Sequence, residues 1–159
     1  MRDIDIQVLI ENPVDRVFEA WVKPDMLERW LTRKAVVEAA VGGAYELFWE
    51  PERPEHNSTL GCRITDIVPN SELSFNWRGP EEHEEIMGDE TQVFVRLEPC
   101  EGGTLLRFVH TGWGAGAHWE KARAAIASKY GILGWLTVKA SVLRRGKSGS
   151  VGLAITAAR

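Results

Sequence analysis

The residues of this chain that could do chemistry are a few histidines and an unusual number of aromatic side chains. Its 159 residues include 4 histidines and 7 tryptophans. The histidines are His56, His83, His110 and His118. None of them lies four residues from another with a third ligand nearby, although zinc sites are built from such short spacings. The sequence therefore predicts no bound metal and no cofactor.

The sequence lacks the common motifs of enzymes that use a nucleophilic side chain or bind a nucleotide. The chain has no Gly-x-Ser-x-Gly elbow and no phosphate-binding P-loop. The segment GWGAG at 112–116 resembles a glycine-rich loop, but His118 and Trp119 follow it, so we interpret it as an ordinary loop. A Ser/His/Asp or Cys/His nucleophile with no local motif stays open at this point.

One predicted strand, over residues 104–111, forces a choice between two polar side chains. His110 shares a face with Phe108, whereas Arg107 lies on the opposite face. We favour the face of His110 as the interior one, because Phe108 suits a cavity wall and Arg107 is easier to solvate. A buried histidine could donate to a ligand carbonyl or act as a general base. The alternative is a histidine whose hydrogen bonds are satisfied by backbone at the sheet edge.

The tryptophans predict either a closely packed core or a cavity between the rings. Each could bury about 200 Å² of surface, and seven large rings are harder to pack closely than seven leucines. We therefore predict a pocket for an apolar small molecule, with an aromatic wall and a few polar groups that orient the ligand. The predicted wall is Trp49, Phe75, Trp77, Phe108, Trp113, Trp119 and Trp135, and the predicted orienting groups are Tyr45, His110 and Lys139.

Composition excludes several classes of partner. The net charge of −4 argues against non-specific binding to nucleic acid. No apolar run approaches the roughly 18 residues that a membrane span needs, and the alternating start MRDIDIQVLI has no signal-peptide core. Cys62 and Cys100 form no CxxC motif, so we expect free thiols. These features predict a cytoplasmic protein with no nucleic-acid partner and no membrane insertion.

The elements that must position these residues begin with a half-buried strand over 4–10, where apolar and polar residues alternate. Asn12 as the cap and Pro13 at the first helical position then predict the start of a helix. A second short helix is predicted to restart at Pro24. Further strands are predicted over 44–50, 60–68, 73–77, 91–98 and 104–111, with turns at 69–71 and 101–103.

Apolar residues recur at helical spacing from about residue 117 to 143, which predicts a helix about 40 Å long. Gly131 and Gly134 each cost about 1 kcal/mol inside a helix, so a kink or break is expected. A sheet must bury one face against another layer. The predicted fold is therefore α+β: a curved antiparallel sheet of six or seven strands wrapped around a long C-terminal helix, with two short helices after the first strand. We predict one domain over 1–145 and a frayed or extended tail over 146–159.

Elements in this order resemble the START-like (SRPBCC) superfamily with the helix-grip fold, and within it the group named after the activator of the heat-shock-protein-90 ATPase. The matching stretches are NPVDRVFEAW, KPDMLERWL, VGGAYELFW, LGCRITDIVPNSELSFNW, GGTLLRFVHTGW and GILGW, which span most of residues 4–143. The resemblance implies a cavity between sheet and helix that often holds an apolar small molecule. Where the family tends to place leucines after GILGW, this chain has Lys139 and Val142. Lys139 could meet an acidic ligand group or extend to water.

Three functions follow as hypotheses. The first is binding of an apolar or aromatic small molecule in the cavity, as a carrier or sensor of the stress-response type. The second is a polyketide cyclase- or hydrolase-like enzyme that uses the same cavity and needs a buried acid–base pair. The third is a chaperone ATPase co-regulator that acts through its surface and needs an exposed patch. Binding ranks first because no catalytic signature is present, and a chaperone partner and a homodimer both stay open.

Overall fold

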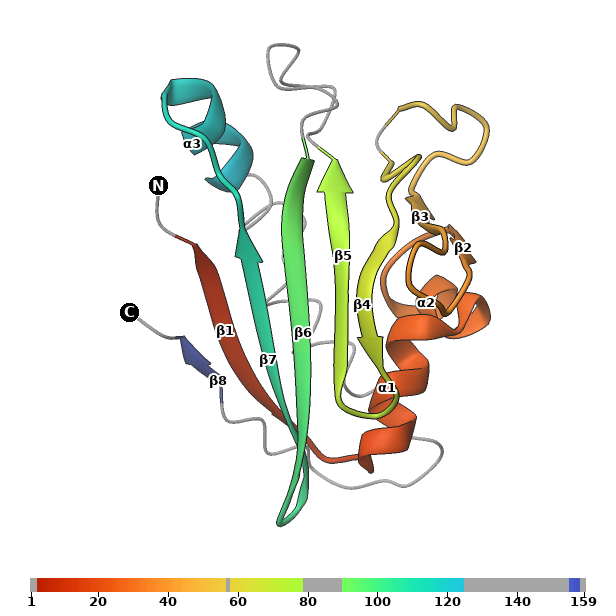
Figure 1. Cartoon of the computed structure of the whole chain (residues 1–159), viewed down its shortest axis with the longest axis vertical. Coiled ribbons are helices and arrows are strands. Elements are labelled where there is room, and N and C mark those ends of the chain that lie inside the picture. Colours follow the sequence, from red (N-terminus) through yellow and green to blue (C-terminus); the bar gives the residue numbers. More distant parts are fainter. Residues whose placement is uncertain (1–2, 57, 79–89, 125–154, 158–159) are drawn as a thin grey trace.

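The structure is a computed structural model that describes residues 3–56, 58–78, 90–124 and 155–157 (Figure 1). The strands are β1 (Ile4–Ile10), β2 (Lys34–Val37), β3 (Tyr45–Phe48), β4 (Ile64–Val68), β5 (Glu72–Arg78), β6 (Glu90–Cys100), β7 (Gly103–Thr111) and β8 (Ile155–Ala157). The helices are α1 (Val14–Val22), α2 (Pro24–Trp30) and α3 (Ala117–Ala124).

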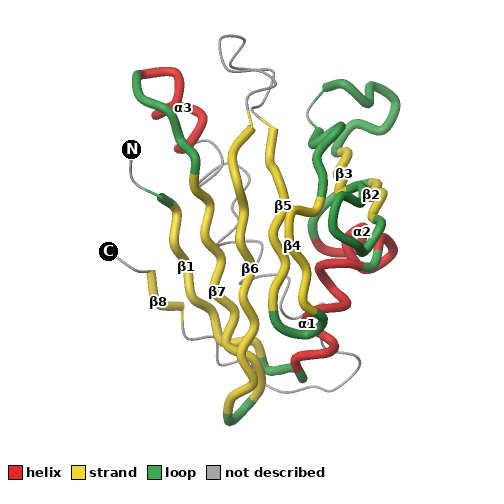
Figure 2. The backbone as a smooth tube through the Cα atoms, in the orientation of Figure 1, coloured by secondary structure: helices red, strands yellow, loops and turns green. Residues whose placement is uncertain are grey.

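One antiparallel sheet dominates the described residues. Its strand order is β4-β5-β6-β7-β1-β8, and β2 and β3 form a separate two-stranded sheet. Figure 2 shows the longer strands side by side, with α3 following the end of β7. The predicted α+β class with an antiparallel sheet is confirmed, and the two short helices do follow the first strand.

The first strand has the alternation that the sequence predicted. Residues 4, 6, 8 and 10 of β1 are buried, and the residues between them are partly exposed. Because successive side chains of a strand point to opposite faces, one face of β1 joins the core. The strand pairs with β7 over its whole length, from Ile4 opposite His110 to Ile10 opposite Thr104.

Helix α1 begins one residue later than predicted, so the prediction of Asn12 as its cap is wrong. Pro13 takes the capping position with an extended backbone (φ −60°, ψ 152°), and no side chain caps the helix. The physical reason is that Asn12 is held at the end of the sheet. Its backbone N–H donates to the carbonyl of Ile10 at 2.8 Å, and its carbonyl accepts from the Thr104 hydroxyl at 2.8 Å. For α2 the prediction is confirmed, since Pro24 opens the helix.

The second sheet was not predicted. Strand β2 has only four residues, too few for a visible period, and it is defined by pairing with β3 from Lys34 opposite Phe48 to Val37 opposite Tyr45. The strand predicted over 44–50 therefore pairs with β2 and lies outside the main sheet. The strand predicted over 60–68 is shorter, because the pairing of β4 with β5 begins at Ile64 and shifts register before Asp66.

Both predicted hairpins of the main sheet are present. β4 and β5 join through the turn at 69–71, where Asn70 has a positive φ of 60°. β6 and β7 pair from Gln92 opposite Thr111 to Cys100 opposite Gly103. Gly103 has a φ of 147°, and a Cβ there would lie 2.1 Å from the carbonyl oxygen of Ile10. Glycine is therefore needed where this hairpin passes the end of β1.

The predicted C-terminal helix is described only over α3, and the remainder of 117–143, including Gly131 and Gly134, lies outside the described residues. Of the predicted tail, the structure describes β8, which pairs antiparallel with β1 from Ile6 opposite Ala157 to Val8 opposite Ile155. The domain boundary at 145 stays a prediction. In the described ranges, no helix combines the length and apolarity needed to cross a bilayer.

Candidate functional site

The buried face of the sheet carries a continuous group of rings, which we call the aromatic cluster. Alternate positions of β5 supply Phe75 and Trp77, and alternate positions of β7 supply Phe108 and His110. The period of two places each pair on one face of its strand. The full cluster in the described residues is Trp21, Trp30, Tyr45, Trp49, Phe75, Trp77, Phe108, His110, Trp113 and Trp119.

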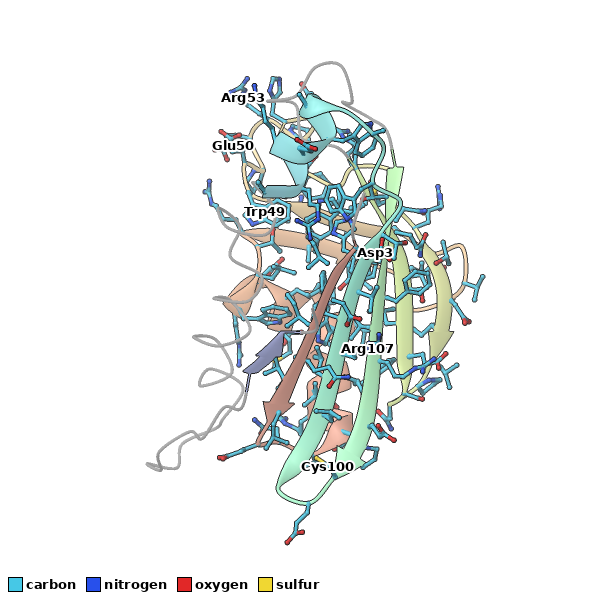
Figure 3. All side chains as sticks on the ribbon, turned by 90° about the vertical axis from the view of Figure 1, so that its left-hand side faces the viewer. Asp3, Trp49, Glu50, Arg53, Cys100 and Arg107 are labelled. Carbon is cyan, nitrogen blue, oxygen red and sulfur yellow. The ribbon has the colours of Figure 1, made fainter. Side chains whose placement is uncertain are left out.

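Five of these rings follow one another as neighbours, and we call this series the line of rings. The ring centroids are 6.3 Å apart for Trp119 and Trp113, and 4.5 Å apart for Trp113 and His110. The centroids of His110 and Trp77 are 6.0 Å apart, and those of Trp77 and Trp49 are 5.8 Å apart. These separations fall in the range in which aromatic pairs attract one another. Figure 3 shows Trp49 on the same side of the sheet as α1 and α2.

The other rings extend the cluster toward the two short helices. Tyr45 and Phe75 are stacked with centroids 4.0 Å apart. Trp21 of α1 lies 6.2 Å from Phe108 and 4.9 Å from Trp30 of α2. The cluster therefore joins the helices to the main sheet.

Several polar atoms of the cluster already serve the fold. The Tyr45 hydroxyl donates to the carbonyl of Trp21 at 2.6 Å, and Nε1 of Trp30 donates to the carbonyl of Ala20 at 2.8 Å. Both carbonyls belong to the last turn of α1, where backbone oxygens have no partner within the helix. Nε1 of Trp49 donates to the carbonyl of Leu31 at 2.9 Å. These side chains complete the C-terminal ends of α1 and α2.

His110 is fully buried at the centre of the line of rings. Its Nε2 lies 2.5 Å from Oγ1 of Thr91, and that hydroxyl donates to the carbonyl of Trp77 at 3.2 Å. The other ring nitrogen, Nδ1, has no hydrogen-bond partner among the residues that the structure describes. Burial lowers the pKa of His110 to about 3, so the imidazole is neutral at pH 7.

The opposite face of the sheet is partly exposed and carries both charged and apolar side chains. Arg107 points there and holds Asp5 through two contacts, Nε to Oδ1 at 3.0 Å and Nη2 to Oδ2 at 2.6 Å. The predicted choice of His110 as the interior side chain and Arg107 as the outer one is confirmed. The same face carries an open depression of about 240 Å³, lined by Phe94, Arg96, Arg107, Val109 and Thr111.

The structure brings eight of the ten predicted site residues into the aromatic cluster: Tyr45, Trp49, Phe75, Trp77, Phe108, His110, Trp113 and Trp119. Their role in binding a ligand stays a prediction. The other two, Trp135 and Lys139, lie outside the described residues. Three residues were missed, Trp21, Trp30 and Thr91. Helical spacing was a sufficient signal for the two tryptophans, whereas the position of Thr91 depends on strand register.

One glycine shapes the end of the cluster. A Cβ at Gly114 would lie 2.2 Å from Nε1 of Trp119, so the backbone of the loop after β7 packs directly against that ring. Among the described residues, no group of three or more histidine, cysteine or acidic side chains could hold a metal ion.

Comparison with known families identifies the fold. Residues 11–133 match the family model described as "Activator of Hsp90 ATPase homolog 1-like protein". The chain belongs to this family. The activator of Hsp90 ATPase homolog 1-like family lies in the helix-grip superfamily, as the sequence motifs indicated. No curated protein matches the chain.

Solved structures similar to this member of the activator of Hsp90 ATPase homolog 1-like family share its fold at low identity. Protein MLL2253 from Mesorhizobium loti is 21% identical with a TM-score of 0.71, and the match covers 89% of this chain and 96% of that one. The Aha1 dimer from Colwellia psychrerythraea is 22% identical with a TM-score of 0.69 over 93% and 100% of the two chains. DynU16, a putative protein in the dynemicin biosynthetic locus, is 19% identical with a TM-score of 0.64, over 87% of this chain and 47% of that one.

Proposed function

We propose that this protein binds an apolar or aromatic small molecule against the aromatic cluster, as a carrier or sensor. The observation that carries the proposal is a fully buried His110, set among aromatic rings, whose Nδ1 has no partner in the described part of the chain. Ligand sites of this kind combine a mainly apolar wall with a few polar groups that orient the ligand. The two predicted residues beyond the described ranges, Trp135 and Lys139, are proposed to complete the wall and the polar set.

Binding is favoured over catalysis by the chemistry around His110. A general base works best when its pKa lies near the operating pH, whereas burial lowers the pKa of His110 to about 3. Within the described ranges His110 makes no ion pair or hydrogen bond with a carboxylate. The described residues therefore give His110 no partner for the acid–base pair that the cyclase- or hydrolase-like alternative needs.

The test of binding is native mass spectrometry of the freshly purified protein, followed by organic extraction. We expect a co-purified apolar compound, and we expect its affinity to fall in Trp77→Phe, which shrinks the ring between His110 and Trp49. Phe94→Leu is the matched control, because Phe94 is 44% exposed on the opposite face of the sheet. A clean apo mass, with no change of tryptophan fluorescence across a panel of lipids and aromatics, contradicts the proposal.

A second candidate is co-regulation of a chaperone ATPase through the protein surface. The family description supports this function. So does the open depression on the outer face of the sheet, whose lining combines Phe94 and Val109 with Arg96 and Arg107. The test is the ATPase rate of purified Hsp90 with this protein added. Stimulation that is lost in Phe94→Ala and kept in Trp77→Phe supports this function in place of ligand binding.

We also propose a homodimer, since one structure with this fold is a dimer in solution. Light scattering after size-exclusion chromatography measures the molar mass directly. A mass near the 17.8 kDa of one chain at all concentrations contradicts the dimer.

A further inference from the structure

The hydrogen bonds around His110 assign the proton on its ring. The carbonyl of Trp77 can only accept, and it takes a hydrogen bond from the Thr91 hydroxyl. If that hydroxyl uses its single proton there, its oxygen can accept from Nε2–H of His110 at 2.5 Å. This arrangement makes two hydrogen bonds, whereas a proton on Nδ1 would allow the Thr91 hydroxyl only one of its two partners. The network therefore favours the tautomer with the proton on Nε2.

In that tautomer Nδ1 is a bare acceptor inside the core. His110 is fully buried, and the described residues offer its Nδ1 no donor. Buried acceptors are almost always paired in native proteins, and an unpaired one weakens the fold. A water or the donor group of a ligand can supply the hydrogen bond that the described residues do not.

The surroundings of Nδ1 limit what kind of ligand can do so. Among the described residues, the rings in contact with His110 are Trp113, Trp77 and Phe108, with centroids at 4.5, 6.0 and 6.2 Å. Nε1 of Trp113 is already used, because it donates to the carbonyl of His110 itself at 2.9 Å. A carboxylate or phosphate brings only acceptors, so it would place a charge beside a lone pair in an apolar site. A hydroxyl or a neutral N–H group supplies the missing donor.

We propose that the ligand of the aromatic cluster is a neutral molecule, aromatic or aliphatic, that donates one O–H or N–H hydrogen bond to Nδ1 of His110. The inference rests on the proposed binding function and names the chemical class of the ligand. Because His110 is fully buried, the ligand has to displace side chains or water beside Nδ1. A neutral ligand does so without adding a charge to the core.

The test uses four probes that share one ring system and differ in the substituent at position 2: 2-naphthol, 2-methoxynaphthalene, naphthalene and 2-naphthoate. Tryptophan fluorescence titration gives the affinity of each. We expect 2-naphthol to bind about threefold to tenfold more tightly than 2-methoxynaphthalene, in line with the net value of one hydrogen bond. We expect 2-naphthoate to bind most weakly. In His110→Phe the preference for 2-naphthol should vanish while naphthalene still binds.

A second measurement does not depend on the folding of the variant. Nitrogen-15 NMR of the wild-type protein, labelled at histidine, distinguishes a bare ring nitrogen from a protonated one. We expect a bare Nδ1 in the free protein, whose signal moves with 2-naphthol and stays in place with naphthalene.

The outcomes separate the two proposals. If the naphthalene probes bind equally well, the binding function stands and the donor inference is overturned. A protonated Nδ1, or tighter binding of 2-naphthoate, also overturns the inference. If none of the four probes binds, the binding function and the inference fall together.

Discussion

His110 couples protonation to stability. Its pKa is about 3 in the folded protein and near 6.5 in an unfolded chain. Between these values the unfolded state binds one more proton than the native state, so the contribution of His110 is fully present above about pH 6.5. Stability is then lost as the pH falls toward 3.

We therefore expect the free energy of unfolding to fall by about 1.4 kcal/mol for each pH unit below 6.5 through this group alone. Urea denaturation at several pH values measures the slope in the wild type and in His110→Gln. The glutamine keeps a donor for Thr91 and cannot titrate, so its slope should be shallower. Equal slopes in the two proteins contradict the assignment of a neutral, buried histidine.

We expect the buried hydroxyl of Tyr45 to contribute more to the free energy of unfolding than the ion pair of Asp5 with Arg107. Tyr45 is fully buried and its hydroxyl donates to the carbonyl of Trp21. Tyr45→Phe leaves that carbonyl without the bond, and we expect a loss of about 1–2 kcal/mol in the free energy of unfolding. Asp5→Asn removes the exposed pair with Arg107 and should cost less than about 1 kcal/mol. Chemical denaturation compares the two, and a larger loss in Asp5→Asn would reverse this ranking.

At the scale of elements, the β6–β7 hairpin depends on a close approach to β1. A Cβ at Gly103 would clash with the Ile10 carbonyl, whereas a Cβ at Gly61 would meet nothing within 4 Å. Both residues have a positive φ. We therefore expect Gly61→Ala to cost about 1–2 kcal/mol through backbone conformation alone, and Gly103→Ala to cost clearly more because backbone must move. Thermal unfolding of the two variants gives the comparison. Equal losses of stability would mean that the hairpin can move away from β1 without a loss of free energy of unfolding, which contradicts the prediction.

At the scale of the whole molecule, the role of residues 146–159 can be tested by removing them. In the described part of this segment, three residues pair with the outer edge of β1, which stays bonded along its other edge to β7. We expect the chain that ends at residue 145 to fold, with a melting temperature lowered by no more than a few degrees. Failure of this shorter chain to fold would place the end of the domain beyond residue 145.

The parts of the fold that could be predicted are those set by local pattern. Alternation identified β1 and the inward position of His110, and Pro24 marked the start of α2. Strand β2 was not predicted, because four residues have no measurable period. Asn12 was predicted to cap α1, although its backbone is held at the end of the sheet. In both cases a partner in another strand decides the local structure.

The sequence by itself determined the family, the antiparallel α+β class and eight of the ten side chains of the aromatic cluster, because alternation and turn residues act over a few positions. Only the tertiary structure decided which polar atoms meet. Thr91 lies 19 positions from His110, and Trp21 lies 24 positions from Tyr45. Such pairs depend on strand register and on the docking of α1, which are set by packing of the whole core. For this reason Nδ1 of His110, on which the proposed ligand chemistry depends, is found to have no partner among the described residues only in the folded protein.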